Sequence, residues 1–195
     1  MNLLAHLHLS AGLSAEETAG NVLADFLPNN LVAPPGIDRG ILLHRKIDGF
    51  TDRHPLVAEA CNLISPARRR LAGIIVDIAF DYTLSQKWRD HSDMELRQFI
   101  EEGYSSIQYG SRQLGEVASR LTTRMRQHQW LESYCTIEGM AQTFRRLTRR
   151  SDAVKKLLGS EVEIEANLPE LQALFDQFYP ILYTEATGTT YPVRR

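Results

Sequence analysis

Cysteine is scarce in this chain of 195 residues, which contains only Cys61 and Cys135 and no CxxC motif. Two isolated thiols exclude a disulfide framework, and they argue against a structural zinc site, which usually recruits cysteines. We therefore expect both thiols to be reduced and the protein to be cytoplasmic.

Long apolar runs and an excess of basic charge are also missing. No stretch approaches the roughly 20 apolar residues that cross a bilayer, so no membrane span is expected. The N-terminal segment MNLLAHLHLSAGL lacks the basic start of a signal peptide and places two histidines where the apolar core of such a peptide would lie. The net charge of −2 argues against a general nucleic-acid binder.

The sequence has no strand-like alternation of any length, and its apolar residues recur with a helical spacing. With 43% hydrophobic residues, the chain is long enough for one substantial core. We therefore predict a single all-α domain over 1–195. The residues of about 1–90 carry most of the His and Asp pairs, and a second helical half covers about 91–188.

Capping and proline signals set the expected helix boundaries. Ser14 and Glu17 match a capping box, which opens a helix toward Asp25, and Pro28 ends that helix. Further helices are expected over about 38–50, from Pro55, from Pro66 to about Trp88, over several segments after Asp93, and after Pro169.

The segment GILLHRKIDGFTDRHP, residues 40–55, places His44 and Asp48 one helical turn apart. Apolar residues flank the pair, so its charges lie at the border of a core. An unpaired ion is costly there, and a bound cation would relieve much of that cost. A His–Asp ion pair with nothing bound is the simpler interpretation of one such pair taken alone.

Further His and Asp residues fall in the same part of the sequence. Asp25 stands late in its helix, where the helix dipole disfavours a carboxylate. Asp77 and Asp81 form a second pair four residues apart, in an apolar segment. His6 and His8 would face one way on a strand but diverge by about 200° on a helix, so that only one need point at a site. This mixture favours a divalent cation such as Mn²⁺ or Mg²⁺ over structural zinc.

Four segments carry a family resemblance: MNLLAHLHLS, GNVLADFL, GILLHRKIDGFTDRHP and VDIAFDYTLSQKW. Their order and spacing resemble the acyl carrier protein phosphodiesterase family, also called acyl carrier protein hydrolase. The resemblance covers nearly the whole chain, with specific motifs in residues 1–88. It implies an all-helical, divergent relative of the HD-type metal-dependent phosphohydrolases. Members of the family remove the 4′-phosphopantetheine arm from holo acyl carrier protein, using Mn²⁺ or Mg²⁺.

The resemblance implies a residue-by-residue correspondence with HD proteins. It places Asp25 at the Asp of the His-Asp doublet that gives those proteins their name, and Ala24 stands where the His would be. A histidine from elsewhere would then supply the missing ligand, and Asp77 matches the late Asp of HD sites. In members of the family the residue after the second aspartate is often His, whereas Tyr82 stands here. The candidate metal ligands are His6, His8, Asp25, His44 and Asp77.

The implied reaction is hydrolysis of the phosphodiester that joins a serine to the prosthetic arm. A bound cation would lower the pKa of its water from about 15.7 toward neutrality and offset charge on the phosphoryl oxygens. A neighbouring Asp or His would take the proton, and Arg45 or Arg53 would hold the phosphate, although Arg45 equally fits an ion pair with Asp48 or Asp52. The candidate catalytic residues are Asp25, His44, Arg45, Asp48, Asp77 and Asp81.

Basic side chains gather in two runs of this slightly acidic chain: Arg68, Arg69 and Arg70, and then Arg145, Arg146, Arg149, Arg150, Lys155 and Lys156. A solvated helix face is the usual explanation of such runs. Acyl carrier proteins, however, are strongly acidic helical bundles. A basic rim near the metal would steer such a partner, so the arginines of both runs are candidate partner-binding residues.

Two rival functions stay open at the level of the sequence. An HD-like fold would equally suit hydrolysis of a small nucleotide, including hyperphosphorylated guanosine species. A helical module that binds acyl carrier protein through its basic rim, with an acidic cluster that is merely structural, is the non-enzymatic alternative. The ligand set, the number of metal ions and the oligomeric state are left open as well.

Overall fold

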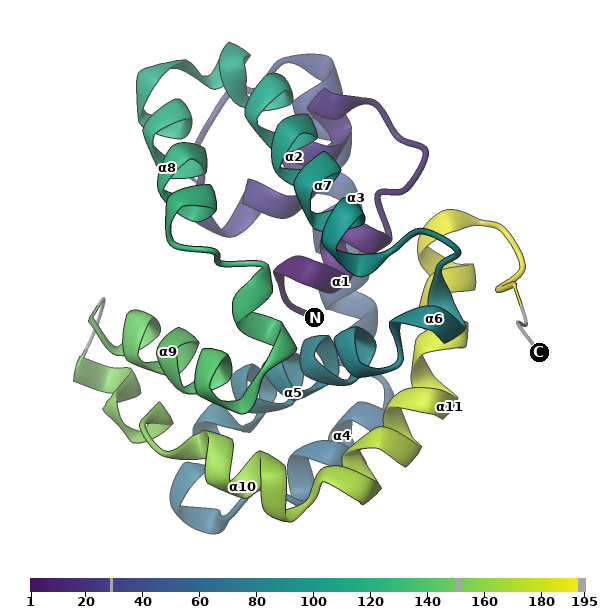
Figure 1. Ribbon diagram of the computed structural model, residues 1–195, viewed down its shortest axis with the longest axis vertical. Helices are drawn as coiled ribbons and strands as arrows, with labels where there is room; N and C mark the ends of the chain where they lie inside the picture. The colour runs from purple at the N-terminus through teal and green to yellow at the C-terminus, as the bar shows by residue number, and fades with distance from the viewer. Residues whose placement is uncertain (29, 150–151, 193–195) are drawn as a thin grey trace.

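The computed structural model describes residues 1–28, 30–149 and 152–192, and within these ranges the chain forms helices and turns but no strand (Figure 1). The predicted all-α class is confirmed. The α-helices are α1 (Leu3–His8), α2 (Ala15–Leu23), α3 (Pro35–Thr51), α4 (Pro55–Asn62), α5 (Ala72–Gln86), α6 (Trp88–His91), α7 (Leu96–Gly110), α8 (Gly115–Gln127), α9 (Ile137–Thr148), α10 (Ser160–Ala166) and α11 (Leu168–Thr187). The 3-10 helices are η1 (Ala24–Phe26), η2 (Pro66–Leu71), η3 (Ser111–Leu114), η4 (Glu132–Cys135) and η5 (Asp152–Leu157). No helix in the described ranges has the length and hydropathy needed to cross a membrane.

The predicted capping box at the start of α2 is confirmed. Ser14 Oγ accepts a hydrogen bond from the backbone N–H of Glu17 at 3.2 Å, and the Glu17 carboxylate accepts one from the N–H of Ser14 at 3.0 Å. Pro55 begins α4, as expected, because its missing N–H would have no partner within the helix at that position. The proline and capping signals therefore predict these two helix starts correctly.

The single helix expected over about 66–88 is divided in the structure. Its first part is the separate turn η2, and α5 begins only after Leu71, whose φ of −114° and ψ of 4° leave the α region. Arg68 in η2 donates hydrogen bonds to the carbonyl oxygens of Lys156 and Leu158 at 2.7 and 2.9 Å. These long-range bonds hold the turn against a distant segment, which the local sequence pattern does not reveal.

Two glycines allow α2 and α3 to touch along their backbones. A Cβ on Gly40 of α3 would lie 2.1 Å from the carbonyl oxygen of Glu17, and a Cβ on Gly20 of α2 would lie 2.2 Å from a carbonyl oxygen of α3. Only a residue without a side chain permits this approach. Because Asn21 follows Gly20 and His44 lies one turn after Gly40, the same contact brings Asn21 to His44.

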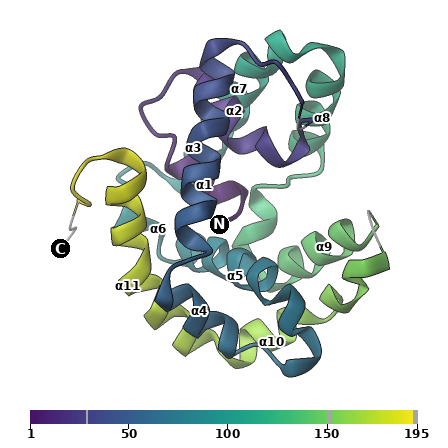
Figure 2. The same cartoon turned by 180° about the vertical axis from the view of Figure 1, so that it is seen from behind.

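The helices form two groups that meet around the N-terminus (Figures 1 and 2). One group contains α2, α3, α7 and α8, the other contains α4, α5, α9 and α10, and α11 runs along one side. Phe80 of α5 packs against Phe175 and Phe178 of α11 in the buried core. Each group combines helices from both halves of the sequence. Residues far apart in the chain therefore meet where the groups join.

Candidate metal centre

Two stacked imidazoles form the centre of the candidate site. His6 of α1 and His44 of α3 are buried, and their ring centroids lie 4.2 Å apart. Asn21 of α2, fully buried, accepts a hydrogen bond from each ring. Its Oδ1 lies 2.9 Å from His6 Nδ1, and its backbone oxygen lies 2.8 Å from His44 Nδ1. Because both acceptors are oxygens, each ring carries a proton on Nδ1 and directs Nε2 toward the site.

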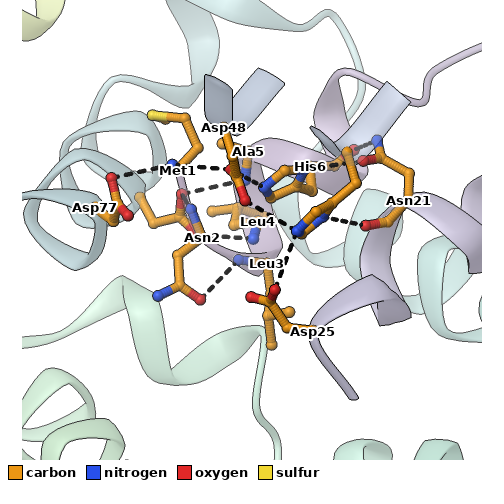
Figure 3. A network of polar contacts seen from close by, with 12 residues as sticks. Met1, Asn2, Leu3, Leu4, Ala5, His6, Asn21, Asp25, Asp48 and Asp77 are labelled. Carbon is orange, nitrogen blue, oxygen red and sulfur yellow. Dashed lines mark hydrogen bonds and ion pairs between the residues drawn. The ribbon is translucent and has the colours of Figure 1, made fainter. Parts of the chain in front are cut away.

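Carboxylates face the two Nε2 atoms. Asp48 lies one turn after His44 in α3, and its two oxygens lie 3.1 Å from His6 Nε2 and 2.9 Å from His44 Nε2. Asp25 of η1 is exposed, and its Oδ1 lies 3.2 Å from His44 Nε2 (Figure 3). The ligand atoms of His6, His44 and Asp48 all lie within 4.8 Å of one another. This cluster is compatible with a divalent cation.

The members of the cluster shift one another's pKa. Burial disfavours the charge of Asp48, but hydrogen bonds from His44 and His6 outweigh it and hold the pKa of Asp48 well below its usual range. Burial also disfavours a charged His44, yet the bonds to Asp25 and Asp48 raise the pKa of His44 to about 9. At His6 burial prevails and lowers the pKa. A cation that binds Nε2 of His44 therefore competes with a proton.

The α-amino group of Met1 lies between two of the carboxylates. It is 3.0 Å from Asp77 and 3.6 Å from Asp48 (Figure 3). Burial lowers the pKa of this amine, but the two carboxylates outweigh burial and raise it to about 10. The sequence predicts Asp77 on the same cation as Asp25 and His44. The structure instead joins Asp77 to the amine, and Asp48 takes the place beside the imidazoles.

Asp81, predicted as a catalytic residue, holds α1 in place. It is fully buried and accepts hydrogen bonds from the backbone N–H groups of Asn2, Leu4 and Ala5, at 3.3, 2.7 and 3.3 Å. Burial raises the pKa of Asp81 to about 7. These bonds satisfy the N-terminal N–H groups of α1, the helix that carries His6. Asp81 thus contacts the site through α1.

His8, the alternative to His6 among the predicted ligands, lies in a different environment. Its Nδ1 is 2.7 Å from the hydroxyl of Tyr179, and its ring packs edge-on against Trp88. The predicted divergence of His6 and His8 on a helix is thus observed, because α1 is helical over both positions. The structure does not bring His8 to the pair formed by His6 and His44.

A cavity of about 230 Å³ opens beside the carboxylates. Asp25, Asp48 and Asp77 from the first half of the chain line it. The second half of the chain also contributes to the lining, with Trp130, Tyr134, Thr143, Arg146 and Leu147. The acidic cluster therefore faces a space that two distant parts of the sequence enclose.

The sequence model of the family described as acyl carrier protein phosphodiesterase matches residues 1–182. The protein of that name from Photorhabdus laumondii is 35% identical over 194 residues, which cover 98% of each chain. The proteins of that name from Yersinia enterocolitica and Salmonella agona are 35% and 33% identical over 189 and 192 residues, 95% of this chain and 97% of each relative. This chain belongs to the acyl carrier protein phosphodiesterase family.

The family resemblance predicted from the four sequence segments is therefore confirmed. No solved structure matches this member of the acyl carrier protein phosphodiesterase family. The implied relation to HD-type phosphohydrolases accordingly stays a prediction.

The arginines of this acyl carrier protein phosphodiesterase family member differ in their relation to the cavity. Arg45 and Arg53, predicted to hold phosphate, are exposed and are not among the described residues that line it. Arg146, predicted only as partner-binding, does line the cavity. It also borders an outer pocket of about 470 Å³, whose lining includes Arg124, His128, Arg145 and Arg149. Arg150, in the same predicted run, lies outside the described residues.

The first predicted arginine run lies in η2. Arg68 is half-buried in an ion pair with Glu163, whereas Arg69 and Arg70 are exposed. A separate pocket of about 290 Å³ is lined by Arg68 and Arg70 together with Lys156. The two arginine runs therefore border different pockets.

Sequence reasoning missed the position of Asn21, which orients both imidazoles. Its signal is weak: an amide in an apolar helix, four residues before Asp25. It also missed that Trp130, Thr143 and Arg146 line the cavity, because nothing in the local pattern of the second half connects those residues to the first.

Proposed function

We propose that this chain hydrolyses the phosphodiester of holo acyl carrier protein and releases apo acyl carrier protein and 4′-phosphopantetheine. Membership of the family and the names of its relatives support this substrate. One observation carries the proposal furthest: the carboxylates of the His–Asp cluster and the guanidinium of Arg146 line a single cavity. A phosphate anion needs such a combination of ligands for a divalent cation and a fixed positive charge.

His6, His44 and Asp48 would hold the cation, with Asp25 as a further oxygen donor beside His44. Two imidazole nitrogens favour Mn²⁺ over Mg²⁺, which prefers oxygen ligands, so Mn²⁺ is the expected ion and Mg²⁺ a weaker substitute. When bound, the cation makes water acidic near neutral pH and offsets negative charge on phosphoryl oxygens. The hydrogen bonds to Asn21 support such binding because they hold both Nε2 atoms toward the cluster.

Asp25 is the carboxylate best suited to take a proton from the attacking water. The hydrogen bond from His44 lowers the pKa of Asp25, so it is ionised at neutral pH. Its exposed side chain lines the cavity, where it can reach a water beside the phosphate.

Water is divided between the two products of this reaction. Its oxygen forms a bond to phosphorus, while the bond between phosphorus and the serine Oγ breaks. Asp25 accepts the proton that the water loses, and the serine Oγ takes up a proton as it leaves. The arm departs with the phosphate, and the serine regains its hydroxyl group.

The remaining predicted residues support the site from outside the reaction. Asp81 caps α1, and Asp77 holds the amine of Met1. Arg45 takes no part in the proposed reaction because it is exposed and is not among the described residues of the cavity lining.

The outer pocket would receive the protein part of the substrate. Arg124, Arg145 and Arg149 line it, and Arg146 borders both this pocket and the cavity. An acidic partner would be attracted to this surface, which would bring its modified serine close to the carboxylate cluster. The surface formed by residues 68–70 is the second candidate, because it borders a different pocket.

Mass spectrometry of holo acyl carrier protein incubated with the protein and Mn²⁺ tests the proposed function. Loss of the whole 4′-phosphopantetheine arm is the expected result. Binding without loss of the arm would support the non-catalytic module. Hydrolysis of guanosine nucleotides together with an intact holo protein would support the nucleotide hydrolase.

The variant Asp48→Asn tests the site itself, and Asp52→Asn is its matched control at the end of the same helix. Asp48 contacts both Nε2 atoms, whereas Asp52 is exposed. We expect Asp48→Asn to lower arm release by orders of magnitude with the helical circular dichroism unchanged, and Asp52→Asn to leave release unchanged. Asp25→Ala and His44→Ala should behave like Asp48→Asn. Equal activities of the two asparagine variants would overturn the assignment.

A further inference from the structure

Arg146 of α9 lines the cavity and contacts two other residues of its lining. Its guanidinium lies over the indole of Trp130, with Cζ 4.5 Å from the ring centroid. One of its nitrogens donates a hydrogen bond to Thr143 Oγ1 at 2.9 Å. Both partners are buried, with exposed fractions of 6% for Trp130 and 2% for Thr143. The contact with the indole and the hydrogen bond to Thr143 together restrict the movement of the guanidinium.

The position of Arg146 distinguishes it from the other arginines of its run. It borders both the cavity with the three carboxylates and the outer basic pocket, whereas Arg145 and Arg149 border only the outer pocket. Among the described residues that line the cavity, Arg146 is the one Arg or Lys side chain. Among the described residues of this lining, Arg146 is therefore the one that can offer a guanidinium to an anion bound beside Asp25 and Asp48.

The cavity needs such a group for electrostatic reasons. The three carboxylates repel a phosphodiester anion; the Met1 amine offsets one of their charges and a divalent cation would offset the other two, so the negative charge of the phosphodiester itself calls for a further cationic group. A planar guanidinium can donate two parallel N–H bonds to two phosphate oxygens, which fixes the orientation of the phosphorus as well as its distance. Lys would provide the charge without this orientation.

We propose that Arg146 binds the phosphodiester of the substrate and orients it toward the His–Asp cluster. This inference rests on the proposed function and adds a residue to it. It replaces Arg45 and Arg53 in the role predicted from the sequence, and it separates Arg146 from the arginines that attract the protein partner. The non-bridging phosphate oxygens are the atoms that accept its hydrogen bonds.

Kinetics with two substrates test this role. Arg146→Met removes the charge at similar length, Arg146→Lys keeps the charge without the planar fork, and Arg112→Met is the control. Arg112 is exposed and its guanidinium also lies over an aromatic ring, that of Tyr109, with Cζ 5.1 Å from the centroid. The substrates are holo acyl carrier protein and bis(4-nitrophenyl) phosphate, a phosphodiester without a protein part.

We expect Arg146→Met to lower kcat for both substrates by about 10²- to 10³-fold, as the loss of one oriented donor to a developing charge does. Arg146→Lys should recover about tenfold of that loss, and Arg112→Met should match the wild type. If Arg146→Met changes only KM for acyl carrier protein and leaves bis(4-nitrophenyl) phosphate hydrolysis intact, Arg146 belongs to the docking surface and the inference is overturned.

A binding measurement separates failure of this inference from failure of the proposed function. Calorimetric titration with 4′-phosphopantetheine in the presence of Mn²⁺ requires no turnover, so it applies even if the wild type leaves holo acyl carrier protein intact. At least tenfold weaker binding by Arg146→Met and Arg146→Lys, with unchanged melting temperatures, supports the inference. Binding equal to that of the wild type overturns it. Should Arg146→Met fail to fold, the result for Arg146→Lys decides.

Discussion

Asn21→Ala should weaken metal binding by releasing one imidazole and leaving the other in place. The substitution removes the Oδ1 that accepts from His6 Nδ1, but the backbone oxygen of residue 21 still accepts from His44 Nδ1. A buried donor left without an acceptor costs about 1–3 kcal/mol, so the free energy of unfolding should fall by at least that amount. Loss of the partner that orients a ligating histidine typically weakens metal affinity by about 10–100-fold.

These magnitudes translate into a measurable loss of stabilisation by Mn²⁺. At a concentration of about 100 times the wild-type Kd, the cation adds about 2.7 kcal/mol to the stability of the folded protein. If Asn21→Ala raises Kd by about 100-fold, the same concentration adds only about 0.4 kcal/mol. Urea unfolding with and without Mn²⁺, together with a calorimetric titration, measures both quantities.

Ser10→Ala is the matched control for this effect. Ser10 Oγ accepts a hydrogen bond from the side-chain nitrogen of Asn21 at 2.8 Å, so its removal disturbs the same network without touching His6 Nδ1. Ser10→Ala should therefore lower stability while Kd for Mn²⁺ changes less than threefold. The reasoning is refuted if both variants weaken Mn²⁺ binding equally, or if Asn21→Ala binds Mn²⁺ as tightly as the wild type.

Three further predictions concern α1, the contact of α2 with α3, and the basic rim. Burial raises the pKa of Asp81 from 3.8 to about 7, so its contribution to stability is full below about pH 4 and is lost as the pH rises through 7. Urea unfolding of Asp81→Asn should accordingly show a flatter pH profile between 4 and 7 than the wild type, and an unchanged profile contradicts the buried cap. A methyl group at Gly40 would lie 2.1 Å from a carbonyl oxygen, whereas one at Gly73 meets nothing within 4 Å. Gly40→Ala should therefore lower the melting temperature by more than 10 °C, whereas Gly73→Ala should not lower it. An unchanged melting temperature of Gly40→Ala would show that α3 can shift away from α2 without cost. Replacing Arg145 and Arg149 together by Gln should raise KM for acyl carrier protein and make KM depend less on salt, with kcat unchanged. If KM stays at the wild-type value across a salt series, the arginines of η2 are the docking surface instead.

Local patterns in the sequence predicted the parts of the site that lie within one helix. His44 and Asp48 share a face because they are one turn apart, and α3 places them side by side as expected. The capping box at Ser14 predicted the start of α2 for the same reason, since both of its bonds join residues three apart. Periodicity and capping are properties of neighbouring residues, so the sequence displays them directly.

The rest of the site depends on contacts between distant helices. Asn21 reaches His44 only because two glycines let α2 and α3 approach. A glycine within a helix does not reveal from the sequence which other helix packs against it. Asp77 and Asp81 have the same spacing as His44 and Asp48, yet one holds the amine of Met1 and the other caps α1. Spacing identifies which groups share a face, but packing decides what that face meets.

The cap that Asp81 places on α1 makes the folding of α1 depend on α5, which is synthesised later. A helix of six residues is too short to persist in water alone, and its N-terminus is held by Asp81, 77 residues after Leu4. His6 is synthesised before α5, but it cannot take its place beside His44 until α5 has been synthesised and docked. A nascent chain that ends before residue 81 should hold Mn²⁺ no better than an unstructured peptide with the same histidines. A cation at the proposed site would therefore bind only after the fold is complete.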